Sequence, residues 1–281
     1  MSQFMRKLLT SMAFISILAT ISVAANAAEG PWAQAEYLKA RIVTEKTAVG
    51  KDATLNAGLE IVMEPEWHIY WRMPGDGGLT PELNWKKSTN LKDATLSWPA
   101  PVRFELGGLY GFGYKNSVFL PVTLTPENPG DAITLTLHAN IMVCKDLCVP
   151  QNIDLSLDIP TGDSIIDTQG QTLAAARKNL PYTENRADMK IENVVLGPKA
   201  IVVRAYLAKG FDNADLFVEI GPDFYVVAKP EITPDEKDSR YASLVIAAPE
   251  GIENIANEVM DKTLILTLTK DGKALERRFK F

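Results

Sequence analysis

The stretch "AITLTLHANIMVCKDLCVPQNIDLSLDI" (Ala132–Ile159) decides how the first half of this chain folds. Apolar residues recur at every second position on both sides of its centre, the pattern of strands that place one face on a core. The segment "CKDLC" interrupts the alternation and holds both cysteines of the chain, Cys144 and Cys148. We therefore predict a β-hairpin in which residues 145–147 form the turn and one cysteine lies on either side of it.

The same alternation recurs before this hairpin, in the segments 36–43, 53–62 and 117–125. Gly, Pro, Asn and Asp separate these segments, as is typical of turns. Many short strands with little helix between them predict an antiparallel sandwich with Greek-key connections.

The pattern changes after residue 160, where the alternation stops. The Ala- and Leu-rich segment "TQGQTLAAARKNL" predicts one short helix that ends before Pro181. Alternation then returns, and "KDGK" (Lys270–Lys273) predicts a hairpin with an Asp-Gly turn. We expect an all-β protein of two immunoglobulin-like β-sandwich domains joined by a short helical linker. The expected boundaries are a signal peptide at 1–27, a first sandwich at 28–162, a helical linker at 163–186 and a second sandwich at 187–281.

The N-terminus has the organisation of a secretory signal. Arg6 and Lys7 precede an uncharged, mostly apolar run, Leu8–Val23, and "ANA" (25–27) fits a small-residue cleavage site. The run is short for a membrane span, which needs about 20 apolar residues. We predict that the signal is cleaved and that the mature protein enters an oxidising compartment without stable membrane insertion. An uncleaved N-terminal anchor is the alternative.

The charge balance excludes some classes of partner. The chain has 29 Lys and Arg against 35 Asp and Glu, and removal of the signal leaves 27 against 35. A net acidic chain with scattered charges argues against nucleic acid or anionic lipid as the main partner. The sequence contains no Ser-His-Asp pattern, phosphate-binding loop or dinucleotide fingerprint, and we expect no cofactor.

The cysteine pair allows three interpretations. Directly opposed strand residues have Cα atoms about 4.5–5.5 Å apart, which suits a disulfide. The bridge would close a very short loop, so it would stabilise the fold less than a long-range bridge, and at an exposed turn it would be open to a partner thiol. A structural disulfide without a redox role is the second interpretation. A copper site also remains open, because Cys144, Cys148 and Met142 are soft ligands for Cu(I) that His68 or His138 could join.

Three blocks of sequence resemble the N-terminal periplasmic domain of the DsbD/ScsB family of thiol:disulfide interchange proteins. They are "WHIYWRMPGDGGLTPELNW" (67–85), "WPAPVRFELGGLYGFGYKNSVFLPV" (98–122) and "VCKDLCVP" (143–150). The blocks occur in the order of the family and cover the first predicted sandwich densely. The second predicted sandwich is similar to the family only in general character.

The resemblance implies a periplasmic, immunoglobulin-like thiol–disulfide oxidoreductase. It would pass reducing equivalents from a membrane reductase to periplasmic thioredoxin-like acceptors. By position, Cys148 matches the cysteine that forms mixed disulfides with partners, and Cys144 matches the resolving cysteine. The three-residue spacer is shorter than in enterobacterial DsbD. The chain ends without the transmembrane or thioredoxin-like domains, so we expect a separate membrane-embedded reductase. The alternative is a non-catalytic periplasmic binding module, for copper or a protein partner, with a structural disulfide.

Two aromatic blocks also have two interpretations. The block at 67–71 and the glycine-rich segment at 107–114 are typical of core aromatics and turns. The resemblance instead implies a flap that shields the cysteine pair and opens for partners, with glycines as hinges. On that view, five side chains shield the cysteines or contact the partner: His68, Tyr70, Tyr110, Phe112 and Tyr114.

Overall fold

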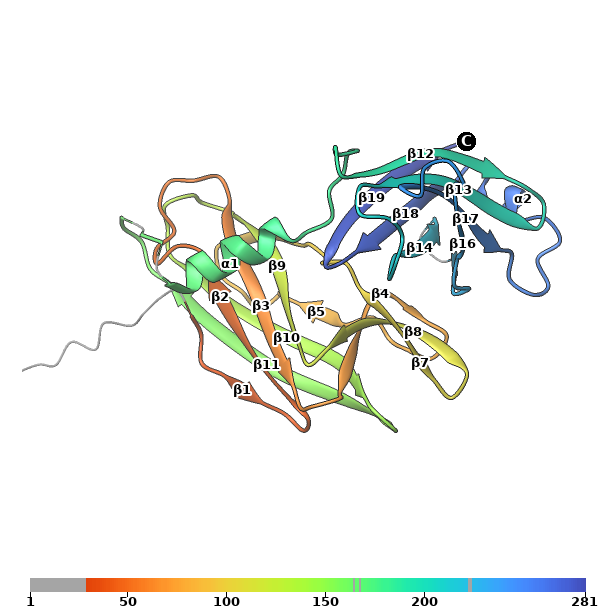
Figure 1. Cartoon of the computed structure of the whole chain (residues 1–281). Helices are drawn as coiled ribbons and strands as arrows, with labels where there is room; N and C mark the ends of the chain where they lie inside the picture. Colours follow the sequence, from red (N-terminus) through yellow and green to blue (C-terminus); the bar gives the residue numbers. More distant parts are fainter. Residues whose placement is uncertain (1–28, 164, 167, 222–223) are drawn as a thin grey trace, which may run out of the picture.

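The computed structural model describes residues 29–163, 165–166, 168–221 and 224–281. The predicted signal peptide lies outside these ranges. Figure 1 shows two lobes built of antiparallel sheets, with a helix lying along the first lobe. The expected all-β fold with two immunoglobulin-like sandwiches is confirmed. Within the described ranges, no helix is long and apolar enough to cross a membrane.

The first domain consists of two sheets. One has the strand order β1-β2-β3-β9-β6, and the other has the order β11-β10-β4-β8-β7, with β5 paired to β10. The strands are β1 (Ala33–Gln34), β2 (Leu38–Thr44), β3 (Leu55–Met63), β4 (His68–Gly75), β5 (Glu82–Asn84), β6 (Leu91–Leu96), β7 (Val102–Leu106), β8 (Leu109–Lys115), β9 (Ser117–Pro126), β10 (Ile133–Cys144) and β11 (Cys148–Ile159).

The hairpin of β10 and β11 confirms the prediction made from its alternation. The two strands pair without interruption from Ile133 opposite Ile159 to Cys144 opposite Cys148. Along β11, buried and exposed residues alternate, because every second side chain points into the sandwich.

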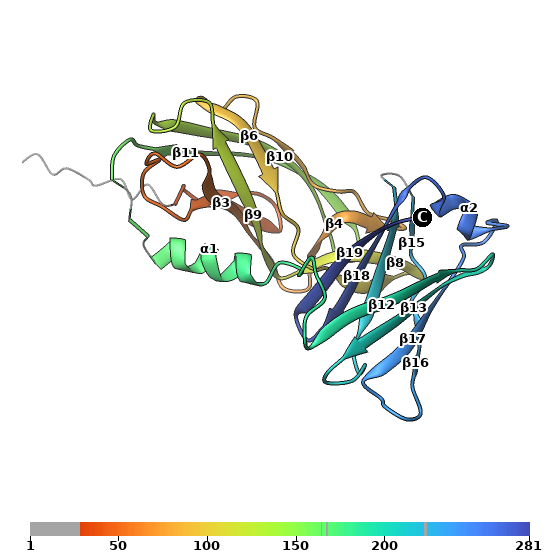
Figure 2. The ribbon, with the colours of Figure 1, turned by 90° about the horizontal axis from the view of Figure 1, so that it is seen from above.

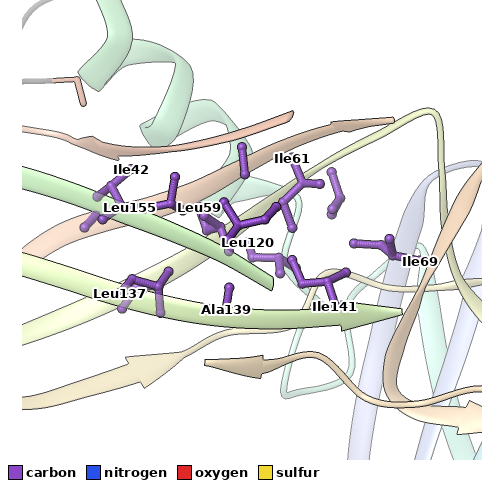
Figure 3. Close-up of a cluster of buried hydrophobic side chains, with 14 of the residues drawn as sticks. Ile42, Leu59, Ile61, Ile69, Leu120, Leu137, Ala139, Ile141 and Leu155 are labelled. Carbon is purple, nitrogen blue, oxygen red and sulfur yellow. The ribbon is translucent and has the colours of Figure 1, made fainter. Parts of the chain in front are cut away.

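The core of the first domain lies between its two sheets. Figure 3 shows Ile42, Leu59 and Leu120 of one sheet facing Leu137 and Leu155 of the other, and all five are buried. Burial of such a side chain contributes about 1.5–3 kcal/mol to folding. Packing in this core holds the β10–β11 hairpin in place, and with it the turn between Cys144 and Cys148.

The part of the second sheet formed by β4, β8 and β7 extends beyond this core. β10 pairs with β4 only at its last residues, Val143 opposite Ile69 and Cys144 opposite His68. In Figure 1, β4, β8 and β7 reach from the first lobe to the underside of the second. The cysteine turn therefore lies beside a sheet of the first lobe whose far end meets the second lobe.

The predicted helix is confirmed as α1 (Thr168–Lys178). It packs on the outer face of the first domain, where Leu173 is buried and a Cβ on Gly58 of β3 would lie 3.0 Å from the Leu173 side chain. Arg177 of the helix donates a hydrogen bond to Thr123 of β9 at 3.2 Å. The helix is thus anchored to the first domain, while the domain boundaries predicted from the sequence stay a prediction.

The second domain is attached at the end of the first where β4 and β8 lie (Figure 2). Its two sheets have the orders β12-β13-β17-β16 and β15-β14-β18-β19. The elements are β12 (Met189–Leu196), β13 (Ala200–Leu207), β14 (Asp215–Ile220), β15 (Phe224–Val226), β16 (Glu231–Pro234), β17 (Tyr241–Ala247), α2 (Ile255–Val259), β18 (Thr263–Lys270) and β19 (Lys273–Lys280).

The C-terminal hairpin has the predicted Asp-Gly turn. Asp271 and Gly272 have φ values of +48° and +76° between the paired residues Lys270 and Lys273. Positive φ at both central residues is the requirement of a type I′ turn, which Asp-Gly meets well. The short helix α2, capped by the Asn254 side chain on the Ala256 N–H, was not predicted.

Candidate functional site: a disulfide hairpin with one buried sulfur

Cys144 and Cys148 form a disulfide at the tip of the β10–β11 hairpin. The S–S distance is 2.04 Å and the Cα atoms are 4.1 Å apart. The turn between them is closed by a hydrogen bond from the Lys145 N–H to the Leu147 carbonyl at 3.0 Å. The hairpin register, fixed by the core, therefore places the two sulfurs against each other.

The two cysteines have very different surroundings. Cys144 is fully buried, at 0 % exposure, whereas Cys148 is exposed. Cys144 ends a strand that has β4 on one side, and Cys148 begins the edge strand β11. Cys148 is therefore the more accessible residue of the pair.

The pairing of β10, β4 and β8 decides which aromatic side chains lie near the disulfide. Residues that are directly opposite in an antiparallel pair share one face of the sheet. Cys144 is opposite His68, and Tyr70 is two residues further along β4, opposite Gly113. His68 and Tyr70 therefore lie on the cysteine face of the sheet.

Phe104 of β7 covers this face. It pairs with Gly111 of β8, and a Cβ on Gly111 would lie only 2.2 Å from the Phe104 ring. The absence of a side chain at this glycine lets the ring lie flat against the sheet and reach across β8. Its centroid is 4.1 Å from that of His68 and 5.9 Å from that of Tyr70, and it forms a small buried cluster with Tyr70 and Cys144.

Tyr70 contacts both sulfurs. Its hydroxyl donates a hydrogen bond to Cys144 Sγ at 3.3 Å and lies 3.8 Å from Cys148 Sγ. Burial raises the pKa of Tyr70 above its ordinary value, so the phenol keeps its proton at neutral pH. The site thus holds a neutral hydroxyl donor next to the buried sulfur.

His68 is a neutral ring in an apolar setting. It is 5 % exposed, and its Nε2 has no hydrogen-bond partner among the described residues. Burial, together with the nearby positive charge of Lys115, lowers the pKa of His68 to about 4. An imidazole with this pKa is uncharged near pH 7 and packs against Phe104 and Tyr70 as an aromatic side chain.

Lys145, in the turn, forms an ion pair at the surface of the protein. Lys145 Nζ lies 2.5 Å from Glu66 Oε2, and both side chains are solvent-accessible. The hydrogen bond from Lys145 lowers the pKa of Glu66, and the same bond raises the pKa of Lys145. The positive charge next to Cys144 is therefore partly offset by a carboxylate.

The flap expected at residues 107–114 is corrected by the structure. Gly107 and Gly108, both with positive φ, form the turn of a hairpin, and residues 109–115 form the regular strand β8. Phe112 and Tyr114 point to the opposite face from Cys144: Tyr114 lies opposite Ile69, and Phe112 is 0 % exposed in the core. These two side chains pack in the core and do not cover the cysteines, while the role predicted for them in partner contact stays a prediction.

Tyr110 lies on the same face of β8 as Phe112 and is half-buried, 5.7 Å from the Arg103 guanidinium. The structure does not place it on the disulfide. The cover that was missed is Phe104, which belongs to the block quoted above at 98–122. The sequence contains a clue to this cover. Gly111 and Gly113 are two residues apart in a strand, so one face of β8 has no side chains there and leaves room for a ring from a neighbouring strand.

The proposed ligands of a copper site do not all come together. His138 is six residues before Cys144 on β10, about 20 Å away at the rise of a strand, and its Nδ1–H donates a hydrogen bond to Asp154 Oδ1 at 2.9 Å. His68 and Met142 do lie near Cys144. The described residues hold no group of three or more His, Cys, Asp or Glu side chains that fits a metal ion.

Comparisons with known proteins found one family model and one solved structure that match this chain well. Residues 34–160 match the family model described as thiol:disulfide interchange protein DsbD, N-terminal. The crystal structure of the N-terminal periplasmic domain of ScsB from Proteus mirabilis superposes with a TM-score of 0.71 and 20 % identity, covering 90 % of this chain and 97 % of that one. A solved chain described as BspA_C_WT reaches a TM-score of only 0.19. No curated protein sequence matches the chain.

The fold is immunoglobulin-like, and the family match together with the Cys144–Cys148 disulfide supports the class of thiol–disulfide interchange domains for the first domain. Residues 34–160 of the first domain match the DsbD N-terminal family model. The similarity to the ScsB domain extends over both lobes and shows that they share its fold.

Reduction of the Cys144–Cys148 bridge is expected to lower the stability of the protein only modestly. The bridge closes a loop of sequence separation 4, for which the loop-entropy model gives about 2 kcal/mol, less than half the value for a loop of about 100 residues. Thermal unfolding of the oxidised and reduced protein measures the difference. Collapse of the first domain on reduction would contradict the expectation and restore the structural-disulfide interpretation.

Proposed function

We propose that this protein is a periplasmic thiol–disulfide exchange protein that passes reducing equivalents through Cys144 and Cys148. The observation that carries the proposal is the asymmetry of the pair: Cys148 is an exposed residue at a hairpin turn, and Cys144 is buried under an aromatic cover. A purely structural bridge has no need of this arrangement.

The exchange divides into two balanced steps. With the pair reduced, the Cys148 thiolate attacks one sulfur of an acceptor disulfide, a mixed disulfide forms, and the other acceptor sulfur leaves as a thiolate. Cys144 then attacks the Cys148 sulfur, which breaks the mixed disulfide, releases the acceptor as a dithiol and restores the Cys144–Cys148 bond. Two electrons pass to the acceptor, and the reverse sequence, with a reduced donor, reloads the pair.

The residues around Cys144 support its role as the resolving cysteine. Whenever a donor attacks Cys148, Cys144 leaves as a thiolate in a buried site, where an unpaired charge is unfavourable. The Tyr70 hydroxyl, already 3.3 Å from Cys144 Sγ, is placed to stabilise that thiolate by a charge-assisted hydrogen bond. Phe104 and His68 keep other thiols from this sulfur.

The proposed partners are thioredoxin-like periplasmic proteins as acceptors and a membrane-embedded reductase as donor. Leu147, next to Cys148 on the turn, is 56 % exposed and offers such a partner an apolar contact at the point of attack. A domain of the DsbD N-terminal family and the fold of a periplasmic ScsB domain support this assignment.

Replacement of the resolving cysteine is expected to trap partners. In the variant Cys144→Ser the mixed disulfide on Cys148 cannot be resolved, so covalent complexes with thioredoxin-like proteins should accumulate in a periplasmic extract. Non-reducing electrophoresis followed by identification of the captured proteins measures them.

The matched control is Cys148→Ser, whose remaining thiol is buried and should trap little or nothing. Equal trapping by both variants would reverse the assignment of roles. Absence of trapped partners with either variant, where an established exchange protein traps its own, would favour the structural-disulfide alternative.

A further inference from the structure

The second domain contacts the sheet of the redox site from behind. Phe217 of β14 packs against Phe112 and Trp71, with ring centroids 5.1 and 5.8 Å apart, and belongs to the core cluster of the first domain. Phe112 and Trp71 lie on the face of β8 and β4 opposite to the one that carries Gly111, Tyr70 and the cysteine pair.

Arg103 links the two domains next to the redox site, in addition to the ion pairs of Arg72 with Glu219 and Glu276 at 2.6 Å. Its guanidinium donates two hydrogen bonds to the Asp215 carboxylate, at 2.8 and 3.0 Å, and others to the carbonyls of Leu216 and Val227. All of these acceptors belong to the second domain. The Arg103 side chain is only 7 % exposed, so the planar bidentate pair is held in a largely dry interface.

The position of Arg103 connects this pair to the cover of the disulfide. Arg103 immediately precedes Phe104 on β7, so their side chains point to opposite faces of the sheet. β7 is the edge strand of its sheet and is bonded to β8 on one side. An edge strand is held by hydrogen bonds to only one neighbouring strand. The hydrogen bonds between Arg103 and the second domain therefore add a restraint on β7.

A second bond reinforces the same region. The hydroxyl of Tyr225 donates to the carbonyl of Gly75 at 2.9 Å, and Gly75 pairs with Gly111, the residue on which the Phe104 ring lies. The second domain therefore holds both the strand that carries Phe104 and the surface on which its ring rests.

We infer that the second domain keeps the Phe104 cover closed over Cys144, with Asp215 as the positioning residue that acts through Arg103. The inference rests on the proposed exchange function, because it explains how the buried cysteine is kept from the wrong thiols. It assigns a role in the redox site to a domain that contributes no sulfur to it. Release of Arg103 would let β7 move and uncover Cys144, while Cys148 would stay as exposed as before.

The test measures the reactivity of each thiol separately. In the full mature chain, Cys148→Ser leaves Cys144 as the only thiol, and Cys144→Ser leaves Cys148. The rate of alkylation by a bulky maleimide is measured in both backgrounds, with and without Asp215→Ala. We expect Asp215→Ala to accelerate labelling of Cys144 severalfold and to leave labelling of Cys148 unchanged.

Two further variants test whether Asp215 acts by positioning Phe104 or by stabilising the protein as a whole. In a Phe104→Ala background Cys144 is already uncovered, so Asp215→Ala should add no further acceleration. Asp235→Ala is the matched control, because it removes an Asp–Arg pair with Arg204, at 2.8 Å, that lies wholly within the second domain. It should leave both labelling rates unchanged.

Unchanged labelling of Cys144 in Asp215→Ala, or an equal acceleration with and without Phe104, would overturn the inference. If Asp215→Ala unfolds the second domain, Asp215→Asn keeps the shape and loses the charge, and it should accelerate labelling in the same direction by a smaller factor. Alkylation needs no redox partner, so a failure of the proposed exchange function would appear in the trapping experiment and not here.

Discussion

The variant Phe112→Ala is expected to lose about 3–5 kcal/mol of the free energy of unfolding, the range for truncation of a buried phenylalanine. Phe112 is 0 % exposed, and its ring lies edge-on against Phe217 and beneath the Arg103 guanidinium, whose carbon is 4.6 Å from the ring centroid. Truncation leaves a cavity where the two domains meet. Chemical denaturation of the full chain measures the loss.

Tyr110→Ala is the matched control, since Tyr110 lies on the same face of β8 but is only half-buried. Its truncation should cost clearly less. A loss below about 1 kcal/mol in Phe112→Ala, together with faster alkylation of Cys144, would show that Phe112 is a cover of the thiols after all and that the assignment to the core is wrong.

Acidification is expected to destabilise the first domain through His68. The pKa of His68 is about 4 in the folded protein against an ordinary 6.5 in the unfolded chain, because the folded site is buried and faces Lys115. Above pH 6.5 both states are neutral at this residue, and the effect is absent. As the pH falls from 6.5 towards 4, the unfolded chain binds a proton that the folded protein does not. Stability is therefore lost over this window, by about 2–3 kcal/mol.

Unfolding free energies measured between pH 7.5 and 4 would reveal this loss. His68→Phe keeps an aromatic ring among Phe104 and Tyr70, removes the titrating group, and should flatten most of the curve. His138→Gln is the control, since the His138 side chain is half exposed on the surface and the loss should persist in this variant. Parallel curves for the wild-type protein and His68→Phe would contradict the expectation.

Much of the fold could be predicted from the sequence, because its signals are local. The alternation in 132–159 is a property of the strand itself, and any strand with one face on a core shows it. The Asp271-Gly272 turn needs two positive φ values that these residues adopt readily. The disulfide follows from the same locality, since a three-residue turn places Cys144 opposite Cys148 in the register observed.

The resemblance of three sequence blocks was enough to predict the family, and the matched family model agrees with it. The error at 107–114 came from interpreting glycines as hinges. In β8 they serve another purpose: Gly111 leaves room for the Phe104 ring, and a Cβ on Gly113 would lie 1.9 Å from the Ile69 carbonyl oxygen. A glycine that permits close approach is indistinguishable in the sequence from one that permits motion.

The sequence by itself determined that two strands and a turn would bring the two sulfurs together. Only the tertiary structure decided which sulfur is buried, because that depends on β4 pairing with the last residues of β10 and on Phe104 reaching over β8. It also decided that Phe217 of the second domain completes the core behind the site. A period of two residues assigns side chains to two faces of a strand, but the neighbour that covers each face is set by pairing between distant segments, which no local pattern encodes.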